Sequence, residues 1–314
     1  MRKGWEYKRW KEVLTIINGK NQSAVVDENG EYPIYGSGGI MGYANNWLCP
    51  ENCVIIGRKG NINKPIFVET KFWNVDTAFG LNANKEYLLP KFLYYFCLDY
   101  NFERHNKAVT IPSLTKADLL KIDIPLPPKS TQLAIVSELD KINELIRLKK
   151  EQLKDFDNLA QSLFYEMFGD PVENEMGWNK MKWKDVLTII NGKNQSAVVD
   201  ENGDYPIYGS GGIMGYANNW LCPEKCTIIG RKGNINKPIF VESKFWNVDT
   251  AFGLKPNIEI LSPRFLFYFC LNYNFERHNK AVTIPSLTKA DLLKIDIPLP
   301  PLPLQRLFAQ RIEQ

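Results

Sequence analysis

The chain has 314 residues, of which 44% are hydrophobic and 24% charged, and its formal net charge is +4. This length is typical of about two domains, and the composition is that of an ordinary globular protein. No apolar run approaches the roughly 20 residues that span a bilayer, and no apolar segment follows the basic start, so we expect a cytoplasmic protein. Because the net charge is small, any anion-binding surface has to be local.

An internal repeat dominates the sequence. Residues 10–128 recur as residues 183–301 at a constant offset of 173, with thirteen differences over 119 positions. A repeat of this length is a whole folding unit rather than a short motif. We therefore expect two copies of one domain, at residues 1–129 and 170–302, with the same working surface in both.

Within one copy, short strands alternate with glycine-rich and basic turns. The predicted strands lie at residues 13–17, 23–26, 53–57, 65–69 and 122–126, and the predicted helices at 90–101 and 116–120. Residues 32–43 contain too many glycines for a regular element, so we expect a tight loop with accessible backbone amides. Each copy is thus predicted to be an α+β domain with a mostly β core.

Residues 130–169 join the two copies and carry a coiled-coil repeat. Apolar side chains recur alternately four and three residues apart from Ile135 to Met167, and only Lys149 interrupts them. A helix of this length spans roughly 60 Å and cannot bury its own seam. We therefore predict a partner-binding face made of Leu139, Ile142, Ile146, Leu153, Phe156, Leu163 and Met167. The alternative is a core helix crossing a globular domain, which regular heptads flanked by charge disfavour.

The six cysteines, three in each copy, do not predict a metal site. Cys49 and Cys53 are spaced Cys-x3-Cys, as are Cys222 and Cys226, but neither pair has a second close pair or a nearby histidine. Because Cys53 leads into an apolar strand, we expect buried, reduced thiols and no metal.

No catalytic constellation is evident in the sequence. The chain lacks a phosphate-binding loop, a nucleophile elbow and a histidine cluster, and Asp76 and Asp118 fit structural roles equally well. We therefore expect a chain that is not an enzyme and holds no cofactor.

Three loops in each copy carry polar and basic side chains suited to DNA, because cations neutralise phosphates and asparagine amides match adenine edges. The predicted DNA-binding residues of the first copy are Tyr35, Ser37, Gly38, Arg58, Lys59, Asn61, Asn63, Lys64, Arg104, His105 and Lys107. Their counterparts are Tyr208, Ser210, Gly211, Arg231, Lys232, Asn234, Asn236, Lys237, Arg277, His278 and Lys280. Solvated turns are the alternative for any single residue, but three such loops in both copies favour DNA.

Different roles are expected within this set. Arg58 and Lys59 are predicted to hold the DNA backbone. Base reading is expected from Tyr35, Ser37, Asn61 and Asn63 and from their copies.

Four motifs in this order resemble the specificity subunit of type I restriction-modification systems. They are Tyr-Pro-Ile-Tyr-Gly-Ser-Gly-Gly (32–39), Val-Ile-Ile-Gly-Arg-Lys-Gly (54–60), Phe-Trp-Asn-Val-Asp-Thr (72–77) and Thr-Ile-Pro-Ser-Leu-Thr-Lys-Ala-Asp-Leu (110–119). The resemblance covers essentially the whole chain. It implies two target-recognition domains that each read half of a split site in double-stranded DNA, and long helices that dock methyltransferase subunits. It also implies that the methyltransferase supplies S-adenosylmethionine chemistry, while a separate restriction and motor subunit cuts.

One feature departs from the family pattern, in which a second long helix follows the second domain. Residues 303–314 provide only the start of that helix. We therefore expect another chain, either a methyltransferase subunit or a second copy, to complete the apolar seam.

The duplication predicts an interrupted palindrome with two identical half-sites, because a two-fold reader requires an inverted repeat. Two other functions stay open. One is a coiled-coil adaptor with tandem protein-binding domains, and the other is the specificity part of a type IIG-like restriction-methylation enzyme. The second is disfavoured because the chain has no cofactor-binding motif.

Overall fold

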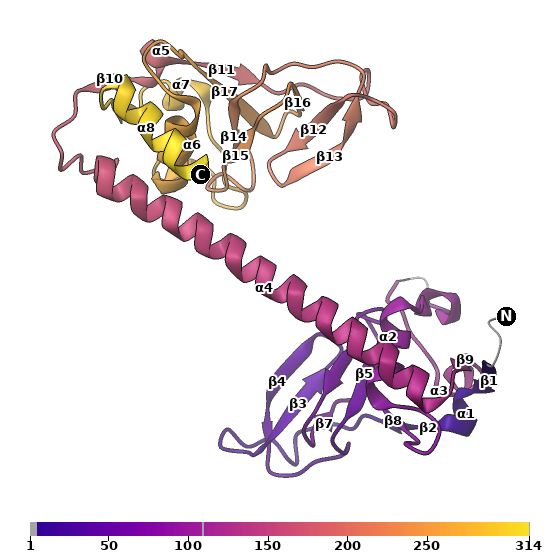
Figure 1. Cartoon of the computed structure of the whole chain (residues 1–314). Coiled ribbons are helices and arrows are strands. Elements are labelled where there is room, and N and C mark those ends of the chain that lie inside the picture. The colour runs from indigo at the N-terminus through magenta and orange to yellow at the C-terminus, as the bar shows by residue number, and fades with distance from the viewer. Residues whose placement is uncertain (1–4, 109, 314) are drawn as a thin grey trace. The chain divides into compact units, whose positions relative to one another are not determined.

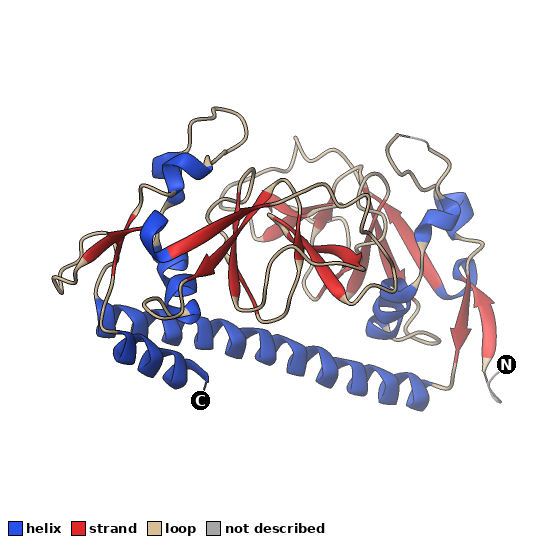
Figure 2. Cartoon of the chain, turned by 90° about the horizontal axis from the view of Figure 1, so that it is seen from above, coloured by secondary structure: helices blue, strands red, loops and turns tan. Residues whose placement is uncertain are grey.

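The computed structural model describes residues 5–108 and 110–313, so residues 1–4, 109 and 314 of the predicted segments lie outside the described part. The chain divides into two compact units, Met1–Lys149 and Lys150–Gln314. Each unit contains one copy of the repeat with mixed α and β structure, which confirms the predicted fold class. Helix α4 (Lys129–Phe168) is unbroken in both views (Figures 1 and 2).

The strands of unit 1 are β1 (Glu6–Arg9), β2 (Leu14–Asn18), β3 (Tyr32–Gly36), β4 (Gly39–Ala44), β5 (Cys53–Gly57), β6 (Ile66–Val68), β7 (Trp73–Asn74), β8 (Ala78–Ala83) and β9 (Asp123–Leu126). Its helices before α4 are α1 (Trp10–Val13), α2 (Pro90–Asp99), the 3-10 helix η1 (Phe102–His105) and α3 (Lys116–Leu119). The order β2-β8-β5-β6 forms an antiparallel sheet, and β4-β3-β7 forms a smaller one in which β3 and β7 are parallel. Strands β1 and β9 pair separately.

Unit 2 repeats this arrangement. Its strands are β10 (Lys180–Lys182), β11 (Leu187–Asn191), β12 (Tyr205–Gly209), β13 (Gly212–Ala217), β14 (Cys226–Gly230), β15 (Ile239–Val241), β16 (Trp246–Asn247), β17 (Ala251–Pro256) and β18 (Asp296–Pro298). Its helices are α5 (Trp183–Val186), α6 (Pro263–Asn272), η2 (Phe275–His278), α7 (Lys289–Leu292) and α8 (Leu302–Glu313). The sheets are ordered β11-β17-β14-β15 and β13-β12-β16.

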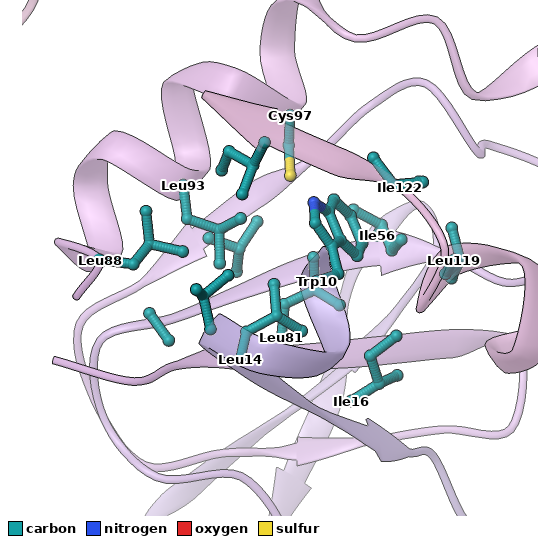
Figure 3. Packing of buried hydrophobic residues seen from close by; sticks show 14 of the residues in the cluster. Trp10, Leu14, Ile16, Ile56, Leu81, Leu88, Leu93, Cys97, Leu119 and Ile122 are labelled. Carbon is teal, nitrogen blue, oxygen red and sulfur yellow. The ribbon is translucent and has the colours of Figure 1, made fainter. Parts of the chain in front are cut away.

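The core of unit 1 lies between its larger sheet and α2. Trp10 is fully buried at its centre, among side chains that include Ile56, Leu81, Leu93 and Cys97 (Figure 3). All five residues of β5 are buried, because sheet neighbours flank it on both edges and side chains cover both faces. A rigid β5 therefore fixes the turn that follows it.

Two sequence predictions were wrong. Residues 32–43 form the β3–β4 hairpin rather than an irregular loop, because Gly39 and Gly42 adopt φ of +124° and +155° and accommodate a register shift beside Tyr35. Residues 23–26 form a turn rather than a strand, since the amides of Val25 and Val26 both donate to Gln22 O. The other predicted strands and helices of the copy are present within one or two residues of their expected bounds.

The start of α4 is fastened to unit 1 by a buried glutamine. Gln132 Oε1 accepts a hydrogen bond from Leu89 N at 2.9 Å, and its Nε2 donates to Tyr87 O at 2.8 Å and Pro127 O at 3.0 Å. In unit 2, Gln305 of α8 makes the equivalent contacts. Helix α8 is thus the structural counterpart of the first turns of α4.

Candidate nucleic-acid interface

The tip of the β3–β4 hairpin lies over the turn that follows β5. A Cβ added to Gly38 would lie 3.6 Å from Asn61 Nδ2, and one added to Gly60 would lie 3.7 Å from Ser37 Oγ. Two of the three loops predicted to bind DNA are therefore neighbours, although more than twenty residues separate them in the sequence.

The turn after β5, here called the basic turn (residues 58–64), has a well-defined backbone. The amides of Arg58 and Lys59 donate to Thr77 O at 2.8 and 3.2 Å. A Cβ on Gly57 would lie 2.4 Å from Asn61 O, so only glycine fits there without a shift. Lys59 and Asn61 are exposed on this rigid turn, which presents a cation beside an amide.

The third predicted loop flanks the basic turn on its other side. Leu114 N donates to Arg58 O at 2.9 Å, and Gly60 N donates to Pro112 O at 3.0 Å. Lys59 also forms a β-bridge with Ser113. The basic turn thus contacts the hairpin tip on one side and residues 112–114 on the other, and Asn106 of the third predicted loop accepts a hydrogen bond from Ser113 N. The surface formed by these loops in unit 1 is here called the three-loop face.

Unit 2 has the same three-loop face. Leu287 N donates to Arg231 O at 2.9 Å, and Gly233 N donates to Pro285 O at 2.9 Å. None of the thirteen differences between the copies falls within residues 32–44, 55–64 or 101–114. The predicted DNA-binding residues are therefore identical in both copies.

Asn63 is engaged in holding the loops together. Its Oδ1 accepts a hydrogen bond from Phe102 N at 2.7 Å, and its Nδ2 donates to Asn101 Oδ1 at 3.3 Å. Asn236 makes the same contacts in unit 2. Because the amide oxygen and one N–H each hold a neighbouring loop residue, this geometry favours loop positioning over the base reading expected from the sequence.

Lys107 is also engaged. Its ammonium lies 2.6 Å from Asp118, whose carboxylate accepts a further bond from the Thr115 hydroxyl at 2.8 Å. These hydrogen bonds, with that from Lys107 first, hold the pKa of Asp118 well below its usual range. In unit 2 the equivalent bond from Lys280 lowers the pKa of Asp291 to about 2. The lysine therefore anchors its loop to the short helix that follows.

Two aromatic nominees are partly buried. The ring of His105 stacks on Tyr100 at an interplanar angle of 13°, and its Nε2 lies 2.6 Å from the Tyr100 hydroxyl. Tyr35 packs edge-on against Phe72, and burial raises its pKa. The exposed residues of the predicted set in unit 1 are Gly38, Lys59, Asn61, Asn63, Lys64, Arg104 and Lys107, and Ser37 and Arg58 are half-buried.

The predicted partner-binding face of α4 divides into two parts. Ile142, Ile146, Leu153 and Phe156 are exposed by 50%, 47%, 63% and 57%, and Leu139 is half-buried. These side chains form an apolar surface on the helix that is available to a partner.

The end of α4, which belongs to unit 2, differs from this prediction because it packs into the core of that unit. Leu163 and Met167 are half-buried against that core, and their neighbours Phe164 and Phe168 are fully buried against Phe265. Leu163 and Met167 are therefore partly covered by their own chain. Pattern reasoning missed Phe164 and Phe168 because the periodic seam runs one position before each of them.

The cysteines are buried thiols, as expected. Cys49 Sγ donates to Asn74 Oδ1 at 3.1 Å, and burial raises the pKa of Cys53 to about 12. Across residues 5–108 and 110–313 no three His, Cys, Asp or Glu side chains gather as metal ligands would. Nor does any helix in that part of the chain have the length and apolarity to span a membrane.

Comparison with known proteins identifies the family. Residues 2–155 and 175–314 match the family model described as the type I restriction modification DNA specificity domain. The chain belongs to this family. It is 26% identical over 329 aligned positions to a Haemophilus influenzae protein provisionally named a type I restriction enzyme specificity subunit, covering 95% of this chain and 84% of that one.

Other relatives agree with the family and its fold. A Methanocaldococcus jannaschii type I restriction enzyme specificity subunit is 24% identical, covering 98% of this chain and 85% of its own. The crystal structure of a type I restriction-modification S subunit from M. genitalium is similar at a TM-score of 0.66 and 18% identity, with 99% of this chain and 90% of that one covered. The resemblance inferred from the four motifs is confirmed.

Proposed function

We propose that this chain is the DNA-reading subunit of a type I restriction-modification complex and performs no catalysis itself. The observation that carries the proposal is the three-loop face, whose loops carry the exposed cations Lys59, Lys64 and Arg104 and the exposed amide of Asn61. Cations of this kind bind phosphates and set the register, while amides read base edges. Membership of a DNA specificity family supports the same conclusion.

The recognised site consists of two identical half-sites. Both copies carry the same residues on the three-loop face, so they prefer the same base pairs. Two copies that read the same base pairs in opposite orientations recognise an interrupted palindrome. The positioning role of Asn63 leaves Asn61 and Ser37 as the first candidates for base reading.

Methyltransferase subunits bind the exposed face of α4 in this proposal. Its side chains, among them Ile146, Leu153 and Phe156, are about half exposed or more, and a row of exposed apolar side chains is typical of a protein-binding surface. The methyltransferase then supplies S-adenosylmethionine chemistry, and the restriction subunit joins through the complex. A second copy of this chain is the alternative occupant of the same face.

The test is a binding titration of the full chain against duplex DNA at several salt concentrations. Each neutralised phosphate releases a counterion, so affinity falls steeply with salt. The double variant Lys59→Ala with Lys232→Ala lowers the slope, whereas the control Lys154→Ala removes a charge from the exposed surface of α4 and leaves the slope unchanged. Negligible binding at every salt concentration, with methyltransferase present, would return the chain to the adaptor class.

A further inference from the structure

A loop beside the basic turn ends in exposed aliphatic side chains. In unit 2 it runs over residues 279–286, here called the finger loop. Val282 is fully exposed and Ile284 is 60% exposed. The counterpart of Ile284 in unit 1, Ile111, is also 60% exposed. Isolated exposed aliphatic residues are common on proteins, so exposure alone does not indicate a binding role. The contacts that hold this loop are the further evidence.

One asparagine closes the base of the finger loop. Asn279 Oδ1 accepts hydrogen bonds from Ala281 N and from Ser286 N, each at 3.0 Å. Its Nδ2 donates to Glu276 Oε2 at 3.0 Å, which turns that carboxylate toward the loop base. In unit 1, Asn106 Oδ1 likewise accepts from Ser113 N at 3.0 Å. A loop tied in this way presents its tip in a defined position.

The finger loop is also fixed to the basic turn. Pro285 O accepts from Gly233 N at 2.9 Å, and Ser286 forms a β-bridge with Lys232. Ile284 directly precedes this attachment, so its backbone lies one residue from Pro285, which is bonded to the basic turn, and its side chain is 60% exposed there. An exposed aliphatic residue is thus fixed, through the backbone, to the turn that carries Lys232 and Asn234.

This combination of groups matches the major groove of DNA. Phosphates flank that groove, base edges offer hydrogen bonds, and the 5-methyl group of thymine offers an apolar contact. The acidic groups near the loop are already occupied, since Glu276 accepts from Asn279 and Asp291 is paired with Lys280 at 2.6 Å.

We infer that Ile111 and Ile284 contact the 5-methyl group of thymine in the two half-sites, and that Asn106 and Asn279 are positioning residues for this contact. The inference rests on the proposed function, because it adds a specificity-determining contact to the same face. It predicts at least one thymine in each half-site.

The experiment begins with selection of bound sequences from a randomised duplex library by the full chain with its methyltransferase. Each thymine of the selected half-site is then replaced by deoxyuridine, which removes only the methyl group. One position in each half-site should lose about fourfold in affinity, the value of one buried methyl-sized group. The affinity of the double variant Ile111→Ala with Ile284→Ala should not change with that replacement. Ile→Val at both positions should keep part of the wild-type affinity loss.

Two further variants make the test specific. Leu98→Ala with Leu271→Ala removes other exposed leucines, at 48% and 42%, and should leave the deoxyuridine response intact. Asn106→Ala with Asn279→Ala should weaken preference at the same base position. Asn→Asp at both positions keeps the acceptor oxygen but places a carboxylate against Glu103 and Glu276, so it should restore the preference only when these glutamates are also changed to Gln.

The outcomes separate the two proposals. If the wild-type chain selects no sequence, the proposed function itself fails. If it selects a half-site whose affinity does not respond to deoxyuridine, or if the isoleucine variants lose only methyltransferase binding, the methyl contact is refuted while DNA reading stands. A kinked duplex with no methyl dependence would indicate a minor-groove wedge and would equally overturn the assignment.

Discussion

The two copies differ in chemistry at a fully buried position, which provides a matched pair of experiments. Val54 lies in β5 and is 0% exposed, whereas its counterpart Thr227 in β14 is 1% exposed. Among the residues that the structure describes, Thr227 Oγ1 has no hydrogen-bond partner. A buried hydroxyl without a partner costs about 1–3 kcal/mol, while a methyl group of similar size costs nothing comparable.

The variant Thr227→Val should therefore raise the free energy of unfolding of unit 2 by about 1–2 kcal/mol. The reverse change, Val54→Thr, should lower that of unit 1 by a similar amount. For units of this size, about 1 kcal/mol corresponds to a Tm shift of roughly 2–4 °C. Native-state hydrogen exchange of the β5 and β14 amides assigns each change to its unit.

The double variant that exchanges the two residues should reverse the difference between the units. If Thr227→Val left the protection of β14 unchanged, or Val54→Thr left that of β5 unchanged, the hydroxyl would have a partner in solution. The reasoning from the buried atom would then be wrong.

Three further predictions concern the three-loop face and α4. Lys59→Ala should weaken binding to all DNA sequences alike and should lower the slope of log affinity against log salt by about one, as measured by titration. A changed sequence preference would contradict the phosphate role of Lys59. Asn63→Ala should speed hydrogen exchange at the Phe102 amide, which donates to the Asn63 side chain. Asn61→Ala should leave exchange at that amide unchanged and should alter the preference at one base position by about 1–3 kcal/mol. Phe164→Ala should destabilise unit 2 by about 3–5 kcal/mol in denaturant unfolding, whereas Phe156→Ala should leave stability within about 0.5 kcal/mol and weaken methyltransferase binding. Equal destabilisation by both phenylalanine variants would contradict the assigned packing.

Much of the fold could be predicted because local signals agree with the final structure. Pro90 begins α2 at a position where its missing N–H costs nothing, and the apolar run at residues 53–57 becomes the central strand β5. The predicted spacer, residues 130–169, differs from α4 by one residue at each end. The β3–β4 hairpin was not predicted because several glycines in a row usually indicate a loop. Here Gly39 and Gly42 instead allow a register shift within paired strands.

The buried face of α4 could not be predicted from periodicity. Leu163 and Phe164 are both apolar, so the sequence pattern does not decide which of them faces a domain. Gln132 was missed for a different reason, because its burial depends on three backbone partners and not on hydrophobicity.

The candidate site was predictable as a set of residues but not as an arrangement. Charge and amide content nominate Lys59 and Asn61, yet the contact between the loops depends on backbone bonds such as Gly60 N to Pro112 O, which side-chain identity does not encode. The same limit explains Asn63, whose residue type suits base reading and whose neighbours use it for positioning.

The central claim is that two identical faces read two identical half-sites. Sequencing of the methylated positions in a host that carries this chain with its methyltransferase tests it most directly. The methylated sites should form an interrupted palindrome with identical half-sites. Unrelated half-sites would contradict the shared specificity of the two units, and a direct repeat would contradict the predicted inverted order of the half-sites.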